Sequence, residues 1–93
     1  MSNTIDTWTL NFRPEGGGRI TGSLTVTDED VQFSSGDLED DIVLPRSDIA
    51  KAEAAKRLLM KRVVVTMKDG QSLVFEYGLL SVAGIVEAIA IGA

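Results

Sequence analysis

The chain has 93 residues, of which 44% are hydrophobic and 25% charged, the proportions of one small globular domain spanning 1–93. Nine Lys and Arg against fourteen Asp and Glu give a net charge of −5, which argues against nucleic acid as a partner because phosphate neutralisation needs a basic footprint. The absence of Cys and His removes thiol nucleophiles, the usual general base and the commonest transition-metal ligands, so we expect no enzyme, cofactor or metal site.

Apolar and polar residues alternate with a period of two along most of the first 50 residues, which is typical of half-buried strands. A Pro- and Gly-rich break at 13–18 separates the first strand from the second. The expected strands are 7–12, 20–27, 31–35 and 42–44, the last ended by Pro45.

The segment 50–57 is ambiguous. Its Ala, Lys and Glu residues favour a helix over 48–60, which Asp48 could cap. A strand fits the neighbouring pattern, and propensity is a weak guide that tertiary context overrides. We expect a strand at 50–57, with the helix as the alternative.

A hairpin is predicted over 62–77, and its register follows from the faces that its residues must share. A two-residue loop would set Val65 against Val74. A three-residue loop, 68–70, pairs Val65 with Leu73 and therefore predicts a left-handed Gly70 in a bulged turn.

After Gly78 the apolar period changes to three or four, which predicts a helix that begins near a Ser81 N-cap and buries Leu79, Val82 and Ile89. The helix is apolar almost all round, so Leu80, Ala83 and Ile91 are expected to contact something outside the domain. The apolar stretch 78–93 is shorter than the roughly 20 residues of a membrane-spanning helix.

Three stretches follow one another in the order GSLTVTD (22–28), VQF (31–33) and IVLPRSDI (42–49). The 68–70 hairpin and a closing helix come after them. Together these features resemble the pleckstrin-homology-like (PH-like) superfamily, in particular its GRAM-type and bacterial members. The resemblance covers about 7–91 and implies a mainly β fold with one C-terminal α-helix, a partly open seven-stranded β-barrel that the helix caps. The core that it implies is Leu24, Val26, Phe33, Ile42, Leu44, Ile49, Val65 and Phe75, with Ile85, Val86 and Ile89 from the helix.

Two loops, at 16–19 and 37–41, are candidate ligand-binding segments, for a phosphate and a cation respectively. The run Gly16-Gly17-Gly18-Arg19 lacks the Lys-Ser/Thr of a phosphate-binding P-loop, so a flexible hairpin turn is the simpler interpretation. PH-like relatives often contact phosphoinositide head groups through basic residues of the first hairpin, where this chain has Arg13 and Arg19 but also Glu15. The acidic run 37–41 lacks the EF-hand pattern and is expected to be a solvated loop.

A basic segment, 56–62, is the other candidate binding site. Its cations flank Leu58, Leu59 and Met60; they are Lys56, Arg57, Lys61 and Arg62. If 55–61 is a hairpin tip, it could contact an anionic membrane or an acidic partner. Alternatively, the two leucines fold under the sheet and the cations only solvate it.

The leading functional expectation is a non-catalytic interaction module, a protein–protein or self-association adaptor that binds a protein partner or a copy of itself. The charge separation supports it, because residues 1–50 carry three basic and ten acidic side chains (net −7), and 51–93 carry six and four (net +2). The alternative is a peripheral domain that binds anionic membranes through 56–62. The N-terminus lacks the features of a secretory signal, so a cytoplasmic location is expected.

Overall fold

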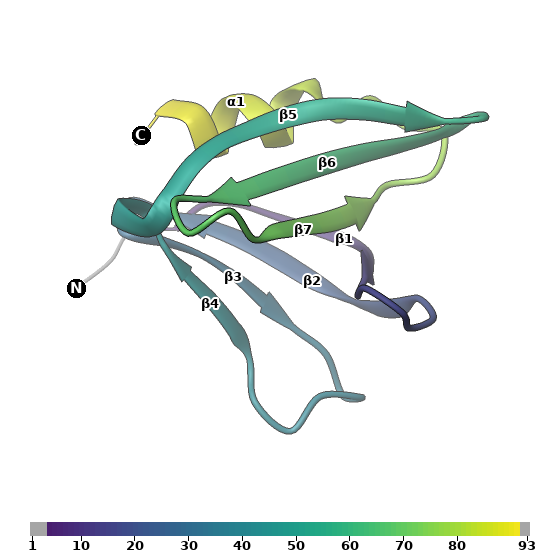
Figure 1. Ribbon diagram of the computed structural model, residues 1–93, viewed down its shortest axis with the longest axis horizontal. Coiled ribbons are helices and arrows are strands. Elements are labelled where there is room, and N and C mark those ends of the chain that lie inside the picture. The colour runs from purple at the N-terminus through teal and green to yellow at the C-terminus, as the bar shows by residue number, and fades with distance from the viewer. Residues whose placement is uncertain (1–3, 92–93) are drawn as a thin grey trace.

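The chain folds into one seven-stranded antiparallel sheet followed by a C-terminal helix, as the computed structural model shows for residues 4–91 (Figure 1). The elements are β1 (Thr4–Arg13), β2 (Ile20–Thr27), β3 (Asp30–Ser34), β4 (Ile42–Pro45), a 3₁₀ turn η1 (Arg46–Asp48), β5 (Ile49–Arg57), β6 (Met60–Met67), β7 (Ser72–Glu76) and α1 (Ala83–Ile91). The mainly β fold with one C-terminal helix is thus confirmed.

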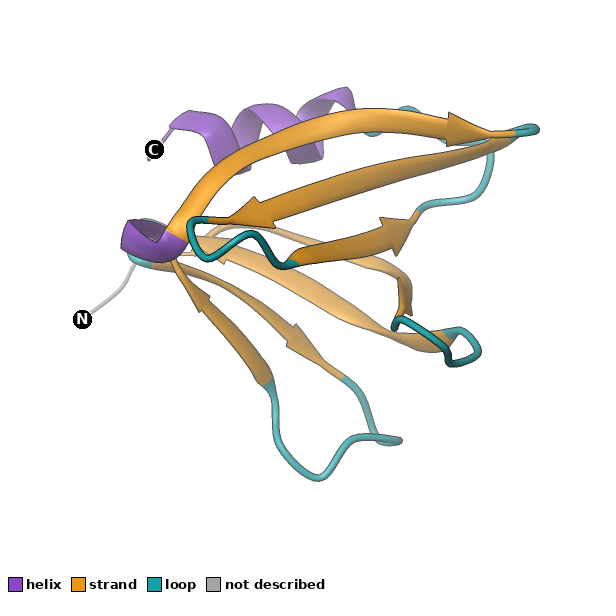
Figure 2. Cartoon of the chain, viewed as in Figure 1, coloured by secondary structure: helices purple, strands orange, loops and turns teal. Residues whose placement is uncertain are grey.

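The strand order is β4-β3-β2-β1-β7-β6-β5, so β4 and β5 are the two edges. These edges do not pair with each other, and the sheet is not closed into a barrel. It curls instead, so that β5, β6 and β7 form one layer and β2, β3 and β4 the other (Figure 2). The layers are joined through a short ladder of three register pairs between β1 and β7, centred on Phe12 and Phe75.

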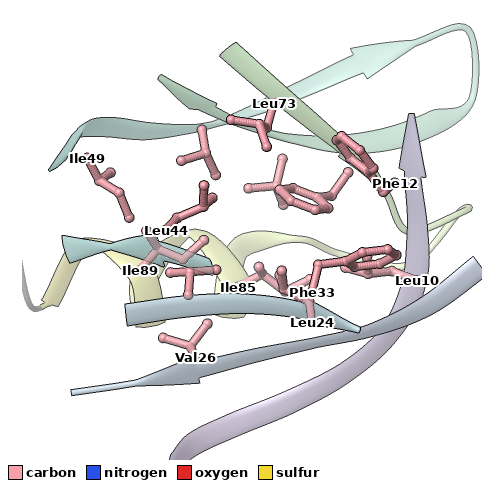
Figure 3. Packing of buried hydrophobic residues seen from close by; sticks show 14 of the residues in the cluster. Leu10, Phe12, Leu24, Val26, Phe33, Leu44, Ile49, Leu73, Ile85 and Ile89 are labelled. Atoms are coloured by element: carbon pink, nitrogen blue, oxygen red, sulfur yellow. The ribbon is translucent and has the colours of Figure 1, made fainter. Parts of the chain in front are cut away.

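The space between the layers holds the core (Figure 3). The ring centroids of Phe12, Phe33 and Phe75 lie 5.3–5.7 Å apart. Helix α1 contributes Ile85 and Ile89, which are both almost completely buried. Seven of the eight strand residues that the resemblance implied are buried, and the eighth, Ile42, packs against them with partial exposure.

The strand predicted at 50–57 is confirmed, since residues 49–57 form β5. Its helix-forming composition is overridden because β5 pairs along its length with β6, placing Ala52 opposite Val65 and Ala54 opposite Val63. Helix α1 runs beside β5 (Figure 1). The small alanine side chains on this strand leave room for that packing.

The 62–77 hairpin has the predicted register, with Val65 opposite Leu73 and Val63 opposite Phe75. Gly70 adopts a φ of 94°, and the backbone N–H of Met67 donates to the carbonyl oxygen of Gln71 at 2.7 Å. A left-handed residue in a three-residue loop is the arrangement that the shared faces required.

The helix differs from its prediction at its start. It begins at Ala83, whose N–H lies 3.3 Å from the hydroxyl oxygen of Ser81, so the expected capping contact is present. Leu79 was expected on the buried helical face, but the chain turns at Gly78 (φ 67°) and leaves Leu79 exposed in the preceding loop. Ile91 ends α1, and its side chain lies outside the described part of the chain.

Gly22 is the glycine that packing requires. A Cβ at this position of β2 would lie 2.2 Å from the carbonyl oxygen of Ser34 and 2.8 Å from the ring of Phe33. We expect Gly22→Ala to lower the free energy of unfolding by about 1–3 kcal/mol, as overpacking does, measured by urea denaturation. Gly84→Ala is the matched control, because nothing lies within 4 Å of its Cβ and alanine favours the helix by up to about 1 kcal/mol. A Gly22→Ala variant as stable as the wild type would contradict this close approach.

Candidate functional site

The β5–β6 hairpin ends in a two-residue turn, with Arg57 and Met60 as the last register pair and Leu58 and Leu59 at the tip. The side chain of Leu58 is 88% exposed and that of Leu59 is 71% exposed. Of the two interpretations of this segment, the one in which the leucines fold under the sheet is therefore wrong. Residues 55–61 form a protruding hairpin tip (Figure 1).

Leu58 has a φ of 55°. Among residues 4–91, every other residue with a positive φ is a glycine. A two-residue hairpin turn favours Gly, Asn or Asp where φ is positive. A bulky side chain there costs about 1–2 kcal/mol because its Cβ approaches the following carbonyl. Folding alone would thus favour another residue at this position, and a strained conformation of this kind often marks a functional site.

A second pair of leucines lies in the loop between β7 and α1. Leu79 is 72% and Leu80 60% exposed. The loop is held against the start of β6, since the N–H of Lys61 donates to the carbonyl oxygen of Gly78 at 2.7 Å and that of Tyr77 donates to Lys61 at 2.9 Å. The loop after β7 passes beside the hairpin tip (Figure 1), and Leu79 lines a hollow with Lys56 and Lys61. Leu80 instead lines a hollow with Thr9 and Thr21 of β1 and β2.

Three cations accompany these leucines. Lys56 and Lys61 are direct cross-strand neighbours, and Arg57 lies next to the turn. Like charges opposite each other in a ladder repel. Among residues 4–91, no carboxylate forms an ion pair with any of the three. The tip surface, defined as Leu58, Leu59 and Leu79 with Lys56, Arg57 and Lys61, is thus apolar and positively charged.

Arg62 does not belong to the tip surface, although the sequence grouped it there. Its side chain is only 18% exposed, and its Nε and Nη2 lie 3.0 and 2.9 Å from Oε2 of Glu76. Glu76 is 3% exposed although it faces outward from the sheet. Arg62 is therefore engaged within the fold.

Arg13 and Arg19 turn toward the same carboxylate, lying 3.6 and 3.9 Å from its other oxygen, Oε1. Within the described chain, Oε1 accepts no hydrogen bond and is compensated by charge alone. The Glu76 cluster, which is this carboxylate with Arg13, Arg19 and Arg62, ties the end of β1 and the start of β2 to β6 and β7. Sequence reasoning missed Glu76, although the predicted hairpin register already placed it opposite Arg62.

Arg46 is a second buried charge that sequence reasoning missed. Its side chain is 8% exposed. The guanidinium donates three hydrogen bonds to backbone carbonyl oxygens: Nε to Thr27 at 2.9 Å, Nη2 to Ala88 at 3.0 Å, and Nη1 to Ile89. The last carbonyls of a helix have no partner within the helix and carry partial negative charge. Arg46 thus anchors the C-terminal end of α1 to β2 and β4. Nothing local marks Arg46, since its partners are 19 to 43 residues away.

The acidic loop and the C-terminal helix, the other features considered from the sequence, offer no metal site and no membrane span among the described residues. The acidic residues at 37–41 lie in the β3–β4 loop. Across residues 4–91 no group of three acidic side chains has an arrangement that could hold a metal ion. Within the same range, the one α-helix is too short to span a bilayer.

Comparisons with known proteins show the fold alone. No family model matches the chain, and no curated protein matches it either. A solved structure, the C-terminal domain of an unknown protein from Leishmania infantum, superposes with a TM-score of 0.80 at 11% identity. The match covers 96% of this chain and 83% of that one.

Proposed function

We propose that this chain is a non-catalytic interaction module of PH-like type that docks onto anionic membrane surfaces through the tip surface. The observation that carries the proposal is Leu58, a bulky apolar side chain held at positive φ and 88% exposed at the end of a hairpin. Seven antiparallel strands followed by one C-terminal helix support the PH-like part, because the sequence resemblance implies that number of strands and a closing helix.

The chemistry of the tip surface favours a lipid surface over an acidic protein. A fully buried leucine gains about 1.5–3 kcal/mol, so inserting the three exposed leucines of the tip surface would supply most of the affinity. Each of the neighbouring cations adds about 1 kcal/mol near an anionic bilayer. The net charge of −5 opposes binding only weakly, because salt screens charges beyond about 8 Å and the acidic β3–β4 loop projects away from the tip (Figure 1).

The variant Leu58→Gly tests this proposal. Glycine accepts the positive φ, so we expect the free energy of unfolding to stay unchanged or to rise by about 1 kcal/mol. We also expect at least about tenfold weaker binding to vesicles that contain phosphatidylserine, because one inserted leucine is lost. The measurement is vesicle co-sedimentation together with urea denaturation.

Two comparisons complete the test. Reversing charge with Lys56→Glu and Arg57→Glu should abolish the preference for anionic over neutral vesicles. Arg19→Gln, which changes a cation away from the tip, should leave binding unaltered. A wild-type chain that ignores anionic vesicles, or a Leu58→Gly variant that binds them as well as the wild type, would show that the tip surface is not a membrane contact.

A further inference from the structure

The two edges of the sheet differ in how far they are protected against pairing with another strand. Edge strand β4 has four residues and ends at Pro45, which lacks an N–H. Edge strand β5 has nine residues and no proline, and seven of the nine are exposed. A long exposed edge strand offers unpaired N–H and C=O groups to an incoming strand.

The ladder identifies the free backbone groups of β5. In antiparallel pairing, successive residues direct their N–H and C=O alternately to one neighbour and then to the other. Lys61 of β6 bonds with residues 77 and 78, on the β7 side, so its register partner Lys56 directs its backbone groups away from β6. By the same alternation, Ala52 and Ala54 also point their backbone groups outward. No hydrogen bond among the described residues joins these groups to α1 or to a loop.

The charges of β5 are self-complementary about Ala52. Lys51 and Glu53 lie on one face, are 61% and 55% exposed, and form an ion pair at 2.7 Å within the chain. If a second β5 pairs antiparallel with Ala52 opposite its own copy, each Lys51 faces Glu53 of the partner subunit. An axis at Glu53 would set two Glu53 side chains against each other, and an axis at Ala54 would set Lys51 against a second cation, Arg57.

We propose that two copies of the chain associate through their β5 edges, antiparallel about a two-fold axis at Ala52, so that the two sheets become continuous. This places Ala52 at a position where both copies exchange N–H and C=O bonds, consistent with its outward backbone groups. Helix α1 packs against β5, but the alanines at 50, 54 and 55 stay exposed, and their small side chains limit steric hindrance to a partner strand.

This inference goes beyond the membrane proposal and uses a different surface. Residues 57–60 of the tip lie beyond the pairing segment, and the antiparallel axis sends the two tips to opposite ends of the dimer. A pairing limited to a few residues buries little area, so the dimer should be weak and salt-sensitive.

Sedimentation equilibrium of the full chain at concentrations up to about 1 mM and at low salt tests the pairing, with vesicles absent. We expect the wild type to move toward the mass of two chains as its concentration rises. Lys51→Glu alone and Glu53→Lys alone should each stay monomeric, because each sets like charges opposite each other. The exchange variant Lys51→Glu with Glu53→Lys should dimerise again, and so should an equimolar mixture of the two single variants.

The control for folding is the far-UV circular dichroism spectrum and urea denaturation of each single variant, which should match the wild type because an exposed ion pair contributes about 0–1 kcal/mol. A wild type that stays monomeric throughout the concentration range would overturn the proposal. Dimers that persist in both single variants would also overturn it, and their loss in Leu58→Gly would assign the contact to the tip instead.

Discussion

Replacing Arg46 with alanine is expected to lower the free energy of unfolding by about 3–5 kcal/mol, because three buried carbonyl oxygens would each lose a charged donor. Three carbonyl oxygens, of Thr27, Ala88 and Ile89, would lose their donor at a site that is almost closed to water. An unsatisfied buried polar group costs about 1–3 kcal/mol. Since domains of this size are stable by only about 5–15 kcal/mol, this one change would remove a large part of the total.

The effect should be centred on α1. Arg46 connects β2 and the β4–β5 turn to the last turn of the helix, whose nine residues are too few to be stable without tertiary contacts. Hydrogen exchange of the α1 amides should therefore accelerate more than that of β6 and β7. Urea denaturation gives the global change.

Two substitutions separate charge from hydrogen bonding at Arg46. Arg46→Lys keeps the charge but has a point-like donor group in place of the planar fork, so we expect about half of the loss. Arg46→Met keeps the apolar volume and leaves the three carbonyls unpaired, so it should be nearly as unstable as Arg46→Ala. If Arg46→Met matched the wild type, the carbonyl contacts would not be what holds the helix.

The elements with local causes could be predicted from the sequence. The register of the 62–77 hairpin followed from the requirement that Val63, Val65, Leu73 and Phe75 share a face, and that requirement allows one loop length. The strand at β5 needed more than local information, because alanine and lysine favour a helix there and only the ladder with β6 overrides them. Both arguments concern strands that are neighbours in the sequence.

The two buried charges could not be found in the same way. Arg46 reaches residues on β2 and α1, and Glu76 is buried only because Arg13 and Arg19 approach from the β1–β2 turn. Tertiary packing decides whether a charged side chain is buried, and the periodicity of the sequence does not indicate such packing. The tip surface could be predicted only in part. Its residues were predicted, but whether Leu58 pointed outward depended on the turn.

The Glu76 cluster leads to the second large prediction. We expect Glu76→Gln to lower the free energy of unfolding by about 2–3 kcal/mol, less than for Arg46→Ala because Arg13 and Arg19 are partly exposed and water screens their charge. Glutamine has nearly the same shape and can still accept from Arg62. The loss would therefore come from the missing negative charge among three cations.

Salt dependence distinguishes this cause from a packing defect. Repulsion among the three arginines is screened by ions, so raising the salt from about 0.05 to 0.5 M should recover part of the stability of Glu76→Gln and affect the wild type less. Urea denaturation at both salt concentrations provides the measurement. Arg19→Gln is the matched single-charge control, since Arg19 is 53% exposed at 3.9 Å, and it should change stability by no more than about 0.5 kcal/mol.

The combination Glu76→Gln with Arg62→Gln completes the argument. If Glu76 acts mainly by compensating its neighbours, removing the closest cation relieves the repulsion, and the double variant should lose clearly less stability than the sum of the two single losses. Additive losses would mean that each side chain contributes through separate contacts.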